Sequence, residues 1–197
     1  MPADSQRNLL QRATADFHVL STILNDMAAD LSAVESMMAA AVETYRESGR
    51  LITFGNGGSA AEAAHIAGEL VGAFRNRDRL GLAAMCLSID ASSISSIAND
   101  YGYESIYARQ LEAFGKPGDL ALGLSTSGSS PNVVAGLERA KELGMKTALL
   151  TGDSYDSDGS EIDYVVKVPS TDVPRVQEVH LLIGHLIAEA IELEVFG

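Results

Sequence analysis

The fold is decided by the stretch Leu51-Ile52-Thr53-Phe54-Gly55-Asn56-Gly57-Gly58-Ser59, in which an apolar, β-branched run leads directly into a glycine-rich turn. A short apolar run bounded by glycines is typical of a buried strand, and a helical pattern follows it. The same unit recurs at Leu124-Ser125-Thr126-Ser127-Gly128-Ser129-Ser130-Pro131-Asn132, where an apolar run ends in a hydroxyl-rich turn before another helical pattern. Both units therefore predict a strand, a loop and a helix in that order.

Strands and helices alternate along most of the remaining chain. Apolar runs predict strands at about 83–89, 119–125, 146–151 and 163–168. Helical patterns cover about 5–24, 27–48, 92–98, 103–114, 131–143 and 174–195, besides the helix that follows Ser59. This order predicts an α/β fold with a doubly wound, parallel five-stranded sheet and an N-terminal helical extension. Both small-residue loops fall at carboxyl ends of strands, where such sheets bind ligands.

The composition indicates a globular, cytoplasmic protein. At 197 residues, of which 46% are hydrophobic, the chain can bury a sizeable core, and we expect residues 1–197 to form a single domain. A formal net charge of −13 disfavours nucleic acid and anionic membranes as partners, because polyanions are bound by basic patches. The N-terminus shows no signal pattern, and no segment approaches the roughly 20 apolar residues of a membrane span. Cys86, the single cysteine, lies in an apolar run and is expected to be buried.

The loop 125–130 carries side chains suited to a phosphate. Its serines and its threonine can donate to one anion, and the backbone N–H groups and the dipole of the following helix would add to them. The Gly-Lys-Ser/Thr sequence of nucleotide-triphosphate loops is missing here, which favours the terminal phosphate of a small metabolite. The alternative is a plain surface turn in which a serine caps the helix.

Two helical segments carry the residue types of a metal site. His65 and Glu69 are four residues apart, so they share one helix face and can offer two ligands to one metal. The alternative is an ordinary surface pair, since many helices carry one. In the last helix Gln177 and His185 are eight residues apart and can share a broad face, with His180 between them.

Taken together, these residues resemble the sugar isomerase (SIS) domain family and, within it, the bacterial phosphoheptose isomerases. The resemblance runs from about residue 8 to about 195. It is carried by Gly55–Ser59, by His65 with Glu69, by the serine loop through Ser130, and by Arg175–His180 with His185. Many SIS proteins share the serine loop, whereas the combination of His65, Glu69, Gln177 and His185 is particular to this group.

The resemblance implies a homotetramer whose subunits share active sites, with one Zn²⁺ per subunit. The implied zinc ligands are His65, Glu69, Gln177 and His185. The implied substrate-binding residues are Asn56, Gly57, Gly58, Ser59, Glu69, Asn99, Asp100, Ser125, Thr126, Ser127, Ser130 and Gln177. The implied substrate is sedoheptulose 7-phosphate, and its isomerisation to D-glycero-D-manno-heptose 7-phosphate leads to nucleotide-activated heptose and the lipopolysaccharide core.

The residues present suit this chemistry. Interconversion of a ketose and an aldose moves a proton between C1 and C2 through an enediolate, which needs a base at carbon and a second group at oxygen. Glu69 is the expected base, and His185 is the expected partner because an imidazole ordinarily titrates near neutrality. Zinc would either polarise the sugar oxygens or hold the two helices together, and the sequence leaves both roles open.

Two other functions fit the sequence less well than a sugar phosphate isomerase does. The spacing Gly55-x-Gly57-x-x-Ala60 satisfies a loose dinucleotide fingerprint, but the ribose-binding acid should follow about 20 residues on at the end of the second strand, and that strand ends well beyond, at Asp90. A dinucleotide site also gives no reason for the second serine loop. The other rival is a non-catalytic SIS tetramer that binds the replication initiator protein. The four metal-competent residues argue against it.

The chain also departs from the family pattern at two places. It has Ala60-Ala61-Glu62 where some members have His-Cys-Asp, and Pro174 where some have aspartate.

The N-terminal helices, over about 5–48, are expected to serve oligomerisation. Apolar residues from Met27 to Tyr45 recur at helical spacing and exceed what a peripheral helix needs, so we expect this stretch to pack at a subunit interface. The alternative is that it covers the sheet of its own chain.

Overall fold

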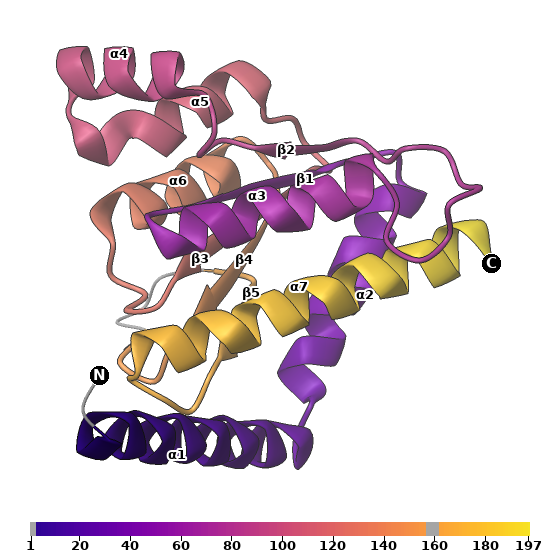
Figure 1. Cartoon of the computed structure of the whole chain (residues 1–197). Helices are drawn as coiled ribbons and strands as arrows, with labels where there is room; N and C mark the ends of the chain where they lie inside the picture. The colour runs from indigo at the N-terminus through magenta and orange to yellow at the C-terminus, as the bar shows by residue number, and fades with distance from the viewer. Residues whose placement is uncertain (1–2, 157–161) are drawn as a thin grey trace.

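A computed structural model describes residues 3–156 and 162–197 (Figure 1). The helices are α1 (Ala3–Ala28), α2 (Ser32–Arg46), α3 (Gly58–Val71), α4 (Ala91–Tyr101), α5 (Ile106–Phe114), α6 (Pro131–Glu142) and α7 (Val173–Phe196), with a 3-10 turn at Tyr103–Ser105. The strands are β1 (Leu51–Gly55), β2 (Ala84–Cys86), β3 (Leu120–Ser125), β4 (Lys146–Thr151) and β5 (Tyr164–Lys167). Across these two ranges, no helix combines the length and the apolar character that a membrane span requires.

The five strands form one parallel sheet in the order β2-β1-β3-β4-β5, which confirms the predicted doubly wound sheet. The chain leaves β1 toward β2 on one side and leaves β3 toward β4 on the other. The switch point of the topology therefore lies between β1 and β3, and this is where sheets of this kind bind ligands. Gly55 at the end of β1 pairs with Leu124 near the end of β3, so the two small-residue loops are neighbours.

Helices cover both faces of the sheet (Figure 1). On one face, α2, α3 and α7 bury a cluster of apolar side chains that includes Met37, Ile66 and Ile183. On the other face, α5 and α6 bury a second cluster around Phe54 and Tyr107, and α4 packs against its edge. Strands β1 and β3 are buried along their whole length, as central parallel strands must be.

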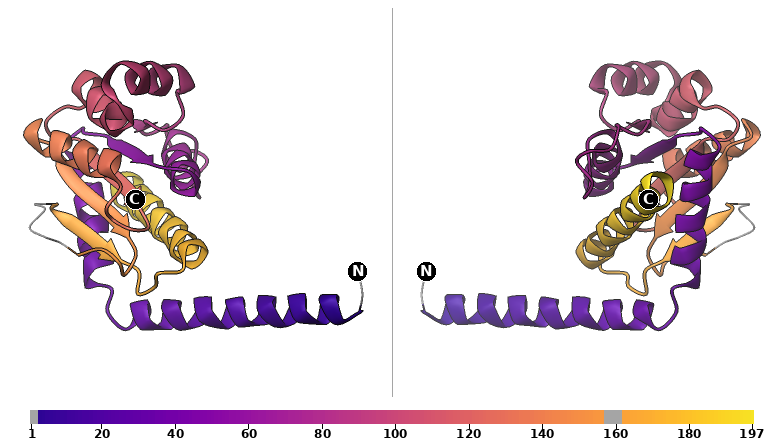
Figure 2. Two further views of the ribbon diagram at one scale, coloured as in Figure 1. Left: turned by 90° about the vertical axis from the view of Figure 1, so that its left-hand side faces the viewer. Right: turned by 90° about the vertical axis from the view of Figure 1, so that its right-hand side faces the viewer.

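The N-terminal helices differ from expectation in two respects. The apolar face of α2, which includes Val34, Met37 and Ala41, is buried against the sheet of its own chain, so this face is not available to a partner. Exposed apolar side chains lie instead on α1, which runs away from the body of the molecule (Figure 2). The break between the helices falls at residues 29–31 rather than near 25, because the Asp30 side chain accepts a hydrogen bond from the Ser32 N–H (2.9 Å) and starts α2 there.

Strand β2 is shorter than the predicted 83–89, because the chain turns away from the sheet after Cys86. Leu87 still donates its N–H to the Thr53 carbonyl, and Cys86 is buried as expected. Asp90 accepts from the backbone N–H groups of Ser92 and Ser93 and caps α4. This carboxylate is therefore engaged by the helix, which further weakens the dinucleotide interpretation.

Candidate active site

The loops after β1 and β3 are joined by a reciprocal pair of amides. Asn56 Nδ2 donates to Asn132 Oδ1, and Asn132 Nδ2 donates back to Asn56 Oδ1, both at 2.8 Å. Asn132 lies in the first turn of α6 and is buried, so this pair fixes the distance between the two loops. Because an amide nitrogen carries two protons, Asn56 keeps one donor for a ligand.

Two tyrosines complete the surroundings of Asn56. Tyr103, in the 3-10 turn after α4, donates its hydroxyl to Asn56 Oδ1 (3.0 Å), and Tyr107 lies 3.2 Å from the same atom. Tyr107 also donates to the Gly55 carbonyl and contacts Ser88, which itself bonds the backbone of Gly55. Burial raises the pKa of Tyr107 to about 12, so it stays a neutral donor.

The serine loop after β3 gathers its hydroxyl groups at one point. Ser125 Oγ lies 3.0 Å from Ser130 Oγ and 3.5 Å from Ser127 Oγ, and it accepts from the Gly128 N–H (3.2 Å). Thr126 anchors the loop through its carbonyl, which accepts from the N–H of Gly152 beyond β4. Gly128 has a φ of +70°, and a Cβ there would collide with Tyr155, so only glycine fits. The loop thus presents neutral donors and no cation.

Ser59, at the start of α3, lies beside the last helix. Its hydroxyl is 3.5 Å from Gln177 Nε2 on α7, and the Ser59 side chain is nearly buried. A Cβ on Gly58 would overlap the Gln177 amide, so the glycine is what allows α7 to approach the loop. Gly57 precedes the first turn of α3, and the N-terminus of this helix adds a partial positive charge to the same region.

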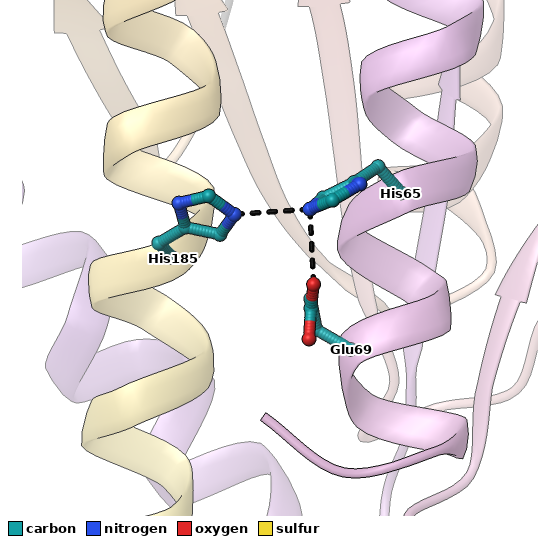
Figure 3. A group of neighbouring side chains, drawn as sticks. All are labelled: His65, Glu69 and His185. Atoms are coloured by element: carbon teal, nitrogen blue, oxygen red, sulfur yellow. Dashed lines mark hydrogen bonds and ion pairs between the residues drawn. The ribbon is translucent and has the colours of Figure 1, made fainter. Parts of the chain in front are cut away.

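Further along the same two helices lies a cluster of two histidines and a carboxylate. His65 Nε2 is 3.0 Å from Glu69 Oε1 on α3 and 2.9 Å from His185 Nε2 on α7 (Figure 3). One ligand atom from each of the three residues lies within 4.8 Å of the others. The His65 side chain is 44% exposed and that of Glu69 is 22% exposed, so a small molecule can reach the cluster.

This cluster fits a zinc ion by its chemistry. Zinc prefers imidazole nitrogen and carboxylate oxygen in a tetrahedral arrangement, and catalytic zinc sites use three protein ligands with the fourth position left for water or substrate. The two Nε2 atoms and the Glu69 carboxylate supply such a set. The facing nitrogens also need a cation or a shared proton between them, because two lone pairs at 2.9 Å would repel.

The structure places Gln177, the remaining expected zinc ligand, beside the loop that follows β1. The amide of Gln177 contacts Ser59 and Gly58, whereas His185 lies eight residues further on, about 12 Å along α7. The helix positions therefore separate the two side chains, and the role of Gln177 as a zinc ligand stays a prediction.

Asn99 and Asp100 lie near the end of α4, and both are exposed. Asn99 Nδ2 donates to Asp100 Oδ1 (2.8 Å), and none of the contacts within the described ranges joins either side chain to the serine loop or to the histidine cluster. This segment approaches the site through Tyr103 instead. The substrate contacts expected of Asn99 and Asp100 also stay predictions.

Glu62 is a buried carboxyl group that sequence reasoning did not assign. It lies on α3 between Ser59 and His65, and burial raises its pKa to about 7, against the opposing effect of a hydrogen bond from Ser59. Within the described part of the chain, its Oε2 atom has no hydrogen-bond partner. The only sequence signal was its place in the Ala60-Ala61-Glu62 departure.

His180, on α7, is also buried and unassigned. Burial lowers its pKa to about 4, against a smaller opposing effect of the Thr151 backbone, so the imidazole is neutral at physiological pH. Thr151 ends β4, next to the serine loop. His180 therefore packs beneath the site rather than in it, and its place among the apolar residues of α7 is consistent with this.

Comparison with known proteins first defines the class. The family model described as SIS domain matches residues 17–152, which is more than half of the chain and includes the loops after β1 and β3. The fold, the switch-point loops and this match together define an SIS-domain protein.

Individual relatives show to which group of SIS-domain proteins the chain belongs. A phosphoheptose isomerase of Roseiflexus sp. is 47% identical over 155 residues, 79% of this chain and 78% of that protein. Another, from Clostridium acetobutylicum, is 42% identical over 164 residues, 83% of each. The solved structure of phosphoheptose isomerase GmhA from Neisseria gonorrhoeae matches with a TM-score of 0.86 at 31% identity, over 93% of this chain and 98% of that one. The chain belongs to the phosphoheptose isomerases, isomerase enzymes built on the SIS domain.

Proposed function

We propose that the enzyme interconverts sedoheptulose 7-phosphate and D-glycero-D-manno-heptose 7-phosphate through an enediolate. The observation that carries this proposal is the cluster of His65, Glu69 and His185 on the same two helices as Ser59 and Gln177. A base and an imidazole thus lie within reach of a loop that suits a phosphate. The names of the relatives support a phosphorylated heptose as the substrate.

The spacing along α3 suits a substrate whose phosphate is remote from its reacting carbons. Ser59 and His65 are six residues apart, about 9 Å along the helix. A phosphate bound by Ser59, Ser125, Thr126, Ser127 and Ser130 would leave the other end of an extended sugar chain near the histidine cluster. In a heptose 7-phosphate the five carbons C3 to C7 separate the reacting C1 and C2 from the phosphate, so C1 and C2 can reach Glu69 while the phosphate stays anchored.

Two protein side chains act on the reacting carbons of the sugar. Glu69 removes a proton from C1 of the ketose and returns it to C2, which converts the C2 carbonyl into an alcohol and leaves an aldehyde at C1. With its Nε2 assigned to zinc, His185 would give a proton from Nδ1 to O2 and take one from O1, so the overall reaction is balanced. Zinc, when held by His65, Glu69 and His185, would stabilise negative charge on the sugar oxygens. Asn56 and Gln177 would orient the sugar between the two ends.

The assembly and the pathway belong to the same proposal. Residues 1–197 would act as one SIS domain, with α1 joining copies into a homotetramer. The product would supply nucleotide-activated heptose for the lipopolysaccharide core.

The test is an isomerase assay on sedoheptulose 7-phosphate with zinc-loaded protein and after treatment with a chelator. The proposal expects aldose 7-phosphate to form and expects the chelated protein to be slower. Sedoheptulose without the phosphate is the matched control and should react poorly, because the serine loop then binds nothing. A zinc-loaded protein that forms no aldose from the 7-phosphate would refute the proposal and favour a binding role.

A further inference from the structure

The segment between α3 and β2 lies against the histidine cluster. We call residues 72–79 the Phe74 loop. The ring of Phe74 stacks on the imidazole of His185, with the ring centres 5.3 Å apart and the planes inclined by 25°. His65 meets the same imidazole at a steeper angle of 61°, with the centres 5.1 Å apart. The His185 ring therefore contacts two other rings, and both restrict its rotation.

The backbone of the Phe74 loop is held by one carboxylate. Glu192 lies on α7 about two turns beyond His185. It accepts from the N–H groups of three consecutive residues, Phe74 (2.8 Å), Arg75 (2.9 Å) and Asn76 (3.0 Å). Because the carboxylate and His185 stand on the same helix, these bonds fix the position of the Phe74 backbone relative to the imidazole.

The side chain of Arg79 holds the other end of the loop in place by hydrogen bonds. Its side chain is fully buried and donates to Glu192 Oε1 at 2.6 Å. The same guanidinium donates to the carbonyls of Glu69 (2.7 Å), Leu70 (2.9 Å) and Leu80 (2.9 Å). A buried charge is tolerated only where it is paired and hydrogen-bonded, as it is here. The loop is thus joined both to α7 and to the turn of α3 that carries Glu69.

We propose that the Phe74 loop is a positioning element for His185, in which Glu192 and Arg79 hold the backbone so that the Phe74 ring sets the orientation of the imidazole. The inference rests on the proposed function, because it assumes that His185 binds zinc and transfers protons. The imidazole of a histidine rotates broadly about its last side-chain bond, so a partly exposed ligand gains from a neighbour that selects one orientation. Groups that orient metal ligands in this way typically contribute about 10- to 100-fold to metal affinity or activity.

The test compares Phe74→Leu with the wild type and with Phe74→Tyr. We expect Phe74→Leu to weaken zinc binding by about 10- to 100-fold and to lower kcat, with KM nearly unchanged, because the serine loop that binds the phosphate is untouched. Phe74→Tyr keeps the stacked ring and should restore both zinc affinity and kcat. Zinc affinity is measured by competition with a chromophoric chelator, and folding is checked by circular dichroism of the metal-free proteins.

Phe114→Leu is the matched control, since it removes an exposed ring at the end of α5. It should leave zinc affinity and kcat as in the wild type. Wild-type zinc affinity and kcat in Phe74→Leu would overturn the inference, and so would a loss in Phe74→Tyr as large as in Phe74→Leu. In both cases the proposed function stands if the wild type binds zinc and isomerises the sugar. If the wild-type protein neither binds zinc nor isomerises the sugar, the proposed function and this inference are both overturned.

Discussion

At the scale of one residue, Ser127 illustrates how the proposed phosphate site would bind its ligand. Its hydroxyl is exposed at the mouth of the serine loop, 3.5 Å from Ser125 Oγ, and accepts from the N–H of Ser129. In the proposed site the loop would bind the phosphate with neutral donors, and each such hydrogen bond contributes about 0.5–1.5 kcal/mol net. A loop of this kind anchors its ligand by several modest contributions rather than by one ion pair.

We therefore expect Ser127→Ala to raise KM for the sugar phosphate by about two- to tenfold, with kcat nearly unchanged. Initial-rate kinetics measure both constants. Ser36→Ala, which removes an exposed hydroxyl from α2, is the control and should change neither. A fall in kcat at constant KM in Ser127→Ala would show that the loop does something other than anchor the phosphate.

The residues of the histidine cluster differ in how far the sequence predicts them. His65 and Glu69 follow from helical periodicity alone, since a spacing of four residues places both on one face of α3. His185 comes from a helix 120 residues away, and only the packing of α7 against α3 brings it to His65. Its place in the cluster was expected from the family resemblance, which carries tertiary information that the local pattern lacks.

Phe74, Glu62 and Tyr103 were not predicted as site residues. A phenylalanine in a polar loop carries no local signal, because its effect depends on the backbone bonds that Glu192 supplies from α7. Glu62 is buried in the folded chain, and the reach of Tyr103 to Asn56 depends on the turn after α4. Local periodicity does not encode such contacts between elements.

At the scale of elements, the alternation of apolar runs and helical patterns was sufficient to predict the five strands and the order of the helices. Parallel central strands are buried on both faces, so their sequences read as continuous apolar runs. The ends of the elements were less predictable. Strand β2 stops at Cys86 because Ser88 turns back to bond Gly55, and the Asp30 side chain sets the start of α2. Both boundaries are set by single polar side chains.

Helix α7 couples folding to pH through His180. In the unfolded chain this imidazole takes up a proton near its ordinary pKa of 6.5, whereas burial in the folded protein lowers the pKa to about 4. A group whose pKa is lowered by folding contributes its full stability above the unfolded pKa, and this stability is lost as the pH falls toward the folded pKa. The stability that His180 contributes is therefore lost as the pH falls from about 6.5 to about 4.

His180→Met removes the titrating group and keeps an apolar side chain in the core. Between pH 7 and pH 5, we expect the wild type to lose more free energy of unfolding than the variant, by roughly 1–2 kcal/mol, since one pH unit corresponds to about 1.4 kcal/mol. Urea unfolding at both pH values measures the difference. Equal losses in the two proteins would show that His180 is not buried in its neutral form.

At the scale of the whole molecule, α1 is the feature that a single chain does not explain. Among its side chains, Leu9, Leu10 and Phe17 are 52%, 70% and 76% exposed. The N-terminal part of the helix projects from the body (Figure 2), whereas Leu20, Ile23 and Leu24 near its other end pack against the core. Large exposed apolar side chains on one helix mark an interaction surface. The proposed homotetramer would cover them, and it would do so through α1 rather than through the buried face of α2.

We expect light scattering at micromolar concentration to give about four times the mass of the 20.8 kDa chain. Leu10→Glu combined with Phe17→Glu should shift the mass downward, because it places charges in the buried interface. Leu80→Glu, at an exposed leucine of the body, is the control and should leave the mass unchanged. A monomer mass for the wild type would rule out the assembly.

The central claim is that proton transfer at the sugar carbons takes place at the cluster of His65, Glu69 and His185. Its most direct test is the rate at which solvent deuterium enters C1 and C2 of the sugar 7-phosphate in D₂O, followed by NMR. We expect incorporation by the wild type and by Glu35→Gln, which changes an exposed carboxylate on α2, and a rate about 10²–10⁴-fold lower in Glu69→Gln. Incorporation by folded Glu69→Gln at the wild-type rate would contradict the claim.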